Sequence, residues 1–168
     1  MAQFTITAAE GKMARWPHEI FLINLIFNHV FLFCISIFLS KSYPYSITLA
    51  PIASFAIIAY IEFKSRAIAT SNAMWFVKAH WQIGARRNRI FMALLSVTCI
   101  ISGGGIYLSA AQHWNAIATK ALIGGFGLLP FMVALLVLVV LGNDSVYQAR
   151  DGKLPDNYLA KNPHLQPA

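Results

Sequence analysis

Four stretches of this sequence are almost free of charged side chains and each about 20 residues long, the length that an α-helix needs to cross a bilayer core. They cover residues 20–40, 45–63, 90–111 and 121–142. Short polar loops join the first pair and the second pair, and a longer polar segment separates the two pairs. The sequence therefore predicts an all-α integral membrane protein whose four transmembrane helices form two hairpins.

The composition agrees with a membrane protein and excludes several other classes. Hydrophobic residues make up 58% of the chain and charged residues only 11%, whereas about a quarter of a soluble domain is charged. This imbalance excludes a disordered chain, a secreted disulfide scaffold and an ordinary cytosolic enzyme. The net charge of +7 would indicate nucleic acid for a soluble chain, but here the lipid bilayer is the expected partner and nucleic acid is not.

The basic residues are concentrated on one side of the predicted helices. Four spans place residues 1–19, 64–89 and 143–168 on the same side, and these segments contain 11 of the 13 Lys and Arg residues. Because basic residues are enriched in cytoplasmic loops, we expect a multi-pass protein of the cytoplasmic (inner) membrane with both termini in the cytoplasm. No apolar run precedes residue 20, so no cleavable signal peptide is expected there.

The segment 64–89 has apolar residues at helical spacing and basic residues on its other faces. This pattern predicts an amphipathic cytoplasmic helix between the second and third spans, either separate from the third span or continuous with it. Its basic and indole side chains can rest on anionic lipid, where each basic residue contributes on the order of 1 kcal/mol, or they can dock a partner. The residues assigned to this contact are Lys64, Arg66, Trp75, Lys78, Trp81, Arg86, Arg87 and Arg89.

Small residues gather in the outer halves of the third and fourth spans. In membranes, such residues allow helix backbones to approach closely, and the two groups fall at a similar depth. Close helix packing is the expected role, and a hinge or a ligand cleft lined by unwound backbone is the alternative. The predicted packing residues are Thr98, Ser102, Gly103, Gly104, Gly105, Ser109, Gly124, Gly125 and Gly127.

The first span contains a polar cluster in an otherwise apolar sequence, formed by Asn24, Asn28 and His29. Polar side chains at this depth usually face other helices and find partners there. The hydroxyl groups predicted as partners are those of Ser54, Thr98 and Ser102. An interhelical hydrogen-bond cluster is the expected role, and a ligand or proton carrier at His29 is the alternative.

No catalytic or nucleotide-binding motif is recognisable, so the chain is not expected to be an enzyme, and no metal site is predicted. No cofactor is indicated. A haem between helices typically needs two His at similar depth, and only His29 lies deep, since His18 and His80 are predicted at or beyond the cytoplasmic face. A haem that His29 shares with another subunit and a quinone at an interface are the remaining cofactor hypotheses. The central parts of the spans hold no carboxylate, which argues against a self-sufficient ion pump.

The tail, residues 143–168, lacks an apolar run that could fold alone. We expect it to be disordered or to lie extended on a partner. These features together indicate a non-catalytic small subunit or assembly factor of a larger respiratory, transport or secretion complex, with other integral membrane subunits as partners. The alternative is a homo-oligomeric small transporter or channel whose path runs near Asn24, Asn28 and His29.

Overall fold

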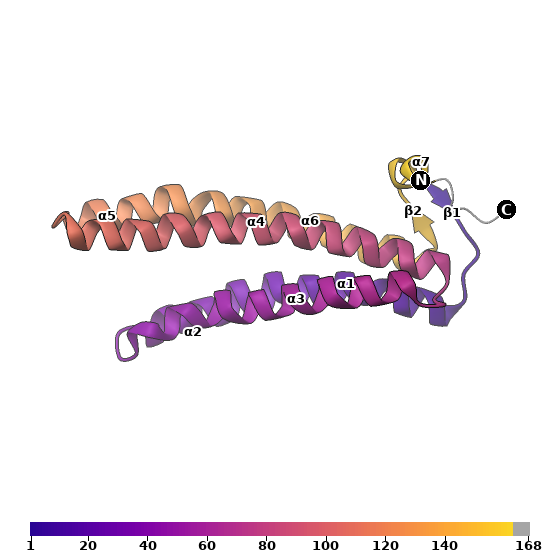
Figure 1. Ribbon diagram of the computed structural model, residues 1–168, viewed down its shortest axis with the longest axis horizontal. Helices are drawn as coiled ribbons and strands as arrows, with labels where there is room; N and C mark the ends of the chain where they lie inside the picture. Colours follow the sequence, from indigo (N-terminus) through magenta and orange to yellow (C-terminus); the bar gives the residue numbers. More distant parts are fainter. Residues whose placement is uncertain (163–168) are drawn as a thin grey trace.

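The computed structural model describes residues 1–162 and contains four helices that are long and apolar enough to cross a membrane. They cover Ala8–Leu39, Pro44–Thr70, Trp75–Ala111 and Ala116–Arg150. Figure 1 shows that the first two helices lie together, as do the last two, and that the chain turns back between helices at both ends of the bundle. We call the end with β1, β2 and α7 the terminal end, and the opposite end the loop end.

Two of the long helices contain a π-helical segment. The first consists of α1 (Ala8–Ile23), η1 (Asn24–Leu32) and α2 (Phe33–Leu39), of which η1 is π-helical. The second consists of the 3-10 helix η2 (Pro44–Thr48) and α3 (Leu49–Thr70). The third is α4 (Trp75–Ala111), without interruption. The fourth consists of α5 (Ala116–Leu122), the π-helical η3 (Ile123–Leu128) and α6 (Leu129–Arg150).

The first helix begins 12 residues before the predicted span because its N-terminus is capped within the polar sequence. The side chain of Thr7 accepts a hydrogen bond from the backbone N–H of Glu10 at 3.2 Å, and the carboxylate of Glu10 accepts one from the Thr7 N–H at 2.7 Å. This reciprocal pair satisfies backbone donors that a helix start leaves free. Pro17 therefore lies inside α1 and not at its start.

The amphipathic helix predicted for residues 64–89 is not a separate element. Residues 64–70 continue α3, residues 71–74 form the turn, and residues 75–89 are the first part of α4. No Pro interrupts the sequence between Trp75 and Ile90, and Gly84 is its only Gly, so the helix runs on into the third span without a break.

The apolar core is contributed by all four long helices. At its centre lie side chains that are at most 7% exposed. They are Phe21, Leu25, Ile58, Ile61, Phe91, Leu95, Phe131, Leu135 and Leu138. Around this core, many large apolar side chains on the same helices are exposed, as expected for helices that face lipid on the outside.

The prediction of a disordered or extended tail is wrong for the part that the structure describes. Beyond α6 the chain forms the short strand β2 (Lys153–Leu154) and the helix α7 (Asp156–Lys161). Strand β2 pairs antiparallel with β1 (Ala2–Gln3), near the start of the chain (Figure 1). Leu154 and Leu159 are buried in a second core with Ala14, Phe76, Ala79 and Ala149. The tail residues 163–168 lie outside the described residues.

A glycine allows this closure of the tail. Gly152 has a φ of +68°, a backbone conformation that side chains disfavour. Its carbonyl accepts a hydrogen bond from the Phe4 N–H at 2.8 Å, and a Cβ at position 152 would lie 2.3 Å from the Phe4 carbonyl oxygen. The chain can therefore turn from α6 into β2 only with a residue that lacks a side chain at this point.

Candidate functional site

The polar cluster predicted in the first span is a buried hydrogen-bonded group in η1. Asn24 is 0% exposed and Asn28 is 4% exposed. The amide nitrogen of Asn28 donates to the side-chain oxygen of Asn24 at 3.1 Å and to the backbone carbonyl of Ala50 at 2.8 Å. Asn28 therefore ties η1 to the start of α3.

His29 makes a second connection between the same two helices. Its Nε2 lies 2.9 Å from the Oγ of Ser54, so Ser54 is the partner among the three hydroxyls predicted from the sequence. The imidazole ring lies edge-on to Phe91 and Phe131, with centroid distances of 5.1 and 5.3 Å. His29 thus lies where η1, α3, α4 and α6 meet.

A cavity of about 310 Å³ lies between the two hairpins on the loop side of His29. Figure 1 shows that the first two long helices separate from the last two toward the loop end. The residues that line the cavity come from both pairs of helices. Its wall is almost entirely apolar, with the rings of Phe33 and Phe131 among its residues. The polar residues of the wall are His29 and the hydroxyl-bearing Thr48, Thr98 and Ser102. The volume is at the lower end of the range for small-molecule sites.

The two π-helical segments both reach this cavity. His29 belongs to η1, and Ile123 and Leu128 are the first and last residues of η3. Such segments are rare and occur frequently at functional sites. Of the glycines in the two clusters, Gly103 lines this cavity, and α4 continues through it as a regular α-helix.

The predicted small-residue packing holds for only part of the set. A Cβ on Gly105 would lie 3.2 Å from Ile123, and one on Gly127 would lie 3.1 Å from Ser102, so α4 and η3 are in close contact at these points. The hydroxyls of Ser109 and Thr119 add a 2.6 Å hydrogen bond between α4 and α5.

The remaining glycines of the two clusters do not pack within the chain. A Cβ would meet nothing within 4 Å at Gly103, Gly104, Gly124 or Gly125. Thr98 and Ser102 both lie in the cavity wall, and the Oγ of Ser102 is buried and lacks a hydrogen-bond partner among the described residues.

A buried histidine pair at the terminal end was missed by the sequence reasoning. His18 on α1 and His80 on α4 are both 0% exposed, and the Nε2 of His18 lies 3.1 Å from the Nδ1 of His80. The Nε2 of His80 lies 3.2 Å from the carbonyl oxygen of Lys153 in the tail. Because a carbonyl can only accept, His80 Nε2 carries the proton, and a neutral His80 then accepts from His18 through Nδ1.

The position of this pair depends on a close approach of two helices. A Cβ on Gly84 would lie 2.9 Å from the Cβ of Pro17, so α1 and α4 touch one turn away from His80. From the sequence, both histidines were placed at or beyond the cytoplasmic face and were not paired. The only sequence signal was the lone Gly84 in a helical segment, because such a residue often marks a close backbone contact.

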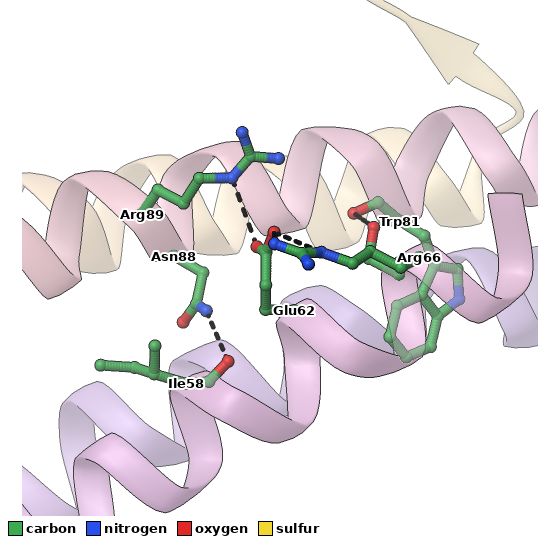
Figure 2. A network of polar contacts seen from close by, with 7 residues as sticks. Ile58, Glu62, Arg66, Trp81, Asn88 and Arg89 are labelled. Carbon is green, nitrogen blue, oxygen red and sulfur yellow. Dashed lines mark hydrogen bonds and ion pairs between the residues drawn. The ribbon is translucent and has the colours of Figure 1, made fainter.

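The basic residues predicted to contact lipid or a partner have several different surroundings. Glu62 on α3 accepts from Arg66 at 3.2 Å and from Arg89 on α4 at 3.3 Å, while the amide of the buried Asn88 donates to the Ile58 carbonyl at 3.0 Å (Figure 2). Arg66 and Arg89 remain mostly exposed, with relative side-chain accessibilities of 78% and 61%.

Three members of the predicted contact surface face the protein interior instead. Trp81 is 2% exposed, and its carbonyl accepts from the Ser65 hydroxyl at 3.3 Å. Trp75 packs edge-on against Phe4 at 4.8 Å. The guanidinium of Arg87 donates to the Leu141 carbonyl and to Ser145 on α6. Lys64 and Arg86 are exposed and Lys78 is partly exposed.

Two further observations complete the description of the site. Within residues 1–162, no three His, Cys, Asp or Glu side chains lie together in a way that could hold a metal ion. Comparison of the chain with protein-family models, with curated proteins and with solved structures gives no significant match.

Proposed function

We propose that this chain is a non-catalytic small subunit or assembly factor of a larger membrane complex, acting through helix packing and through docking at its terminal end. The observation that supports it best is the open space at Gly104 on α4 and at Gly125 on η3, both of which are exposed. Small residues in membrane helices let a neighbouring backbone approach closely. A helix of another subunit can use this surface, which the chain itself leaves uncovered.

The free-energy cost of placing glycines inside these helices supports the same proposal. Glycine in a helix interior is less favourable than alanine by about 1 kcal/mol, and Gly105 and Gly127 offset that cost by packing within the chain. Gly104, Gly124 and Gly125 gain nothing comparable from their own chain. A contact with another integral membrane subunit would supply the missing gain.

Isolation of the intact protein in a mild detergent tests this proposal. We expect other membrane proteins to be recovered in stoichiometric amounts, and we expect Gly104→Leu or Gly125→Leu to lose them. Ala93→Leu is the matched control, because Ala93 is another exposed small residue on α4. Recovery of the wild type as a monomer or simple homo-oligomer that functions alone would contradict the proposal.

We also propose the cytoplasmic membrane as the location, with both termini in the cytoplasm. The support is the concentration of Lys and Arg at the terminal end, where Lys64 and Arg86 remain free to face anionic lipid. Fusions of a reporter that works only outside the cytoplasm would be inactive at the N-terminus and in the 71–74 turn, and active in the 112–115 turn. The opposite pattern would overturn this orientation.

The alternative, a homo-oligomeric transporter with a path near Asn24, Asn28 and His29, has less support. Asn24 and Asn28 hydrogen-bond each other and α3, and of the three residues only His29 lines the cavity. Substrate flux by the protein alone in liposomes, lost in an Asn24→Leu/His29→Leu variant, would favour this alternative over the subunit.

A further inference from the structure

We propose that the cavity between the two hairpins binds a lipid-soluble carbonyl compound of the quinone class, with its ring against Phe33 and Phe131 and a carbonyl oxygen toward His29 and Thr98. This inference does not depend on the proposed subunit role, because the cavity lies within one chain. It is supported by the hydrogen-bond donors in the cavity wall, by the depth of these donors in the membrane and by the shape of the wall.

The proton positions at His29 follow from its one hydrogen bond. If His29 Nε2 donated to Ser54, the Ser54 hydroxyl hydrogen and the Nδ1 lone pair would both lack partners among the described residues. If instead Ser54 donates to Nε2, only the Nδ1–H is left without one. Unpaired polar groups in an apolar environment are costly, so the second arrangement is favoured. His29 then offers a hydrogen-bond donor.

Thr98 supplies a second group of the same kind. It lines the cavity, and its hydroxyl makes no hydrogen bond to any residue in the described part of the chain. Ser102 also lines the cavity, and its buried hydroxyl lacks a partner among the described residues. The wall therefore offers one imidazole N–H and two hydroxyl groups among apolar side chains. A hydrogen-bond acceptor such as a carbonyl oxygen complements these donors, whereas a plain hydrocarbon chain would leave them unsatisfied.

The depth of these donors selects among carbonyl compounds. Counted from the predicted span starts at residues 20 and 90, His29 lies about 13 Å and Thr98 about 12 Å into a core about 30 Å thick. Both are near the middle of the bilayer. The ester carbonyls of a phospholipid lie at the membrane surface beside a charged headgroup, and moving them to mid-membrane would bury that charge. A quinone is apolar enough to place its carbonyls there.

The shape of the wall agrees with a flat ring. Phe33 and Phe131 both line the cavity, and aromatic rings pack favourably against one another edge to face or offset. The volume of about 310 Å³ can hold a substituted ring with the first part of an alkyl tail. The rest of the tail would extend along the lipid-facing side of the cavity.

Binding of decylubiquinone to the purified full-length protein in nanodiscs tests this site. The readout is the ring ¹⁵N chemical shift of His29 in histidine-labelled protein, with the buried His18 and His80 as internal references. Decylbenzene, which has the ring and tail but no carbonyl, is the matched ligand. We expect a saturable shift at His29 with decylubiquinone and none with decylbenzene.

Two variants separate a specific site from partition into lipid. Gly103→Leu should abolish the shift. A Cβ at this position meets nothing within 4 Å, so the leucine side chain can be accommodated and would fill the cavity. Thr98→Val should weaken binding about 3- to 10-fold through loss of one hydrogen bond. Ala110→Leu, on an exposed part of α4 outside the cavity wall, should bind like the wild type.

Three results would overturn the proposal. They are an equal shift with decylbenzene, wild-type binding by Gly103→Leu, and a phospholipid that decylubiquinone does not displace from the wild type in native mass spectrometry. The last result would identify the occupant as a bilayer lipid. The proposed subunit role would fail separately, through the absence of co-purifying partners.

Discussion

The Nε2 of His18 lies 3.1 Å from the Nδ1 of His80, and this contact joins α1, α4 and the tail into one hydrogen-bonded chain that ends at the Lys153 carbonyl. Both rings are completely buried. The donor and acceptor roles are fixed by the carbonyl, so neither ring can be replaced without leaving a polar group unpaired. The two histidines therefore stabilise the terminal end jointly, and each depends on the other for its hydrogen bond.

The histidine pair yields a prediction about non-additivity. His80→Phe should lower the free energy of unfolding by about 1–3 kcal/mol, because it leaves the His18 N–H and the Lys153 carbonyl without partners. His18→Phe/His80→Phe should cost less than the sum of the two single variants, since the two rings then lose their polar groups together. Denaturant unfolding in detergent measures all three; strictly additive costs would refute the coupling.

Replacing a glycine by alanine should change the stability of the protein by an amount that depends on how closely the facing helix approaches that glycine. Gly84→Ala should destabilise the protein by about 1–3 kcal/mol, because the new Cβ would lie 2.9 Å from Pro17, a rigid ring on the facing helix. Gly104→Ala, where nothing lies within 4 Å, should be neutral or stabilise by up to about 1 kcal/mol. Thermal unfolding of the purified variants compares them, and equal effects would show that the close contact of α1 and α4 is absent.

The polar groups between α3 and α4 predict that a neutral amide matters more than an ion pair (Figure 2). Asn88→Ala should cost about 1–3 kcal/mol, because the Ile58 carbonyl loses its buried donor. Glu62→Gln should cost at most about 1 kcal/mol, since both of its arginine partners are largely exposed. A larger loss of unfolding free energy in Glu62→Gln than in Asn88→Ala would contradict this ranking.

Tyr158 in α7 predicts a pH dependence of tail docking. Burial raises the pKa of Tyr158 to about 12, and its hydroxyl donates to Gln82 on α4 at 2.6 Å. Because the pKa is higher in the folded state than in the unfolded chain, where it is about 10, the stabilisation is present below pH 10. It is lost as the pH rises from about 10 through about 12.

Two measurements check this dependence. The difference in absorbance at 295 nm between wild type and Tyr158→Phe should titrate with a midpoint near 12. The stability advantage of wild type over Tyr158→Phe should disappear over the same range of pH. A difference signal with a midpoint near 10 would show that the tail does not bury this side chain.

The four long helices were predictable because hydropathy over 20 residues is a property of the local sequence. The ends of the helices were less predictable. The extension of α1 to Ala8 depends on the Thr7 and Glu10 cap, which lies well outside the apolar run. The tail could not be predicted, because Leu154 and Leu159 show no helical or strand period. They become buried only when the distant segments at Ala14 and Phe76 come together.

The candidate site was predictable in part for the same physical reason. Polar residues in an apolar span identify themselves, so Asn24, Asn28 and His29 were visible in the sequence, as was Ser54 as a hydrogen-bond partner. The π-helical turns of η1 and η3 change which side chains face the cavity, and no sequence period signals them. The pairing of His18 with His80 depends on the rotation of two helices separated by more than 60 residues.

The pairing of β1 with β2 has a consequence for how the protein is made. The partner of Ala2 is Leu154, which leaves the ribosome only after all four apolar helices have been synthesised. The surface around Ala14 therefore stays uncovered until the tail has been synthesised. A chain that ends before β2 would leave this surface and the strand at Ala2 and Gln3 without their contacts.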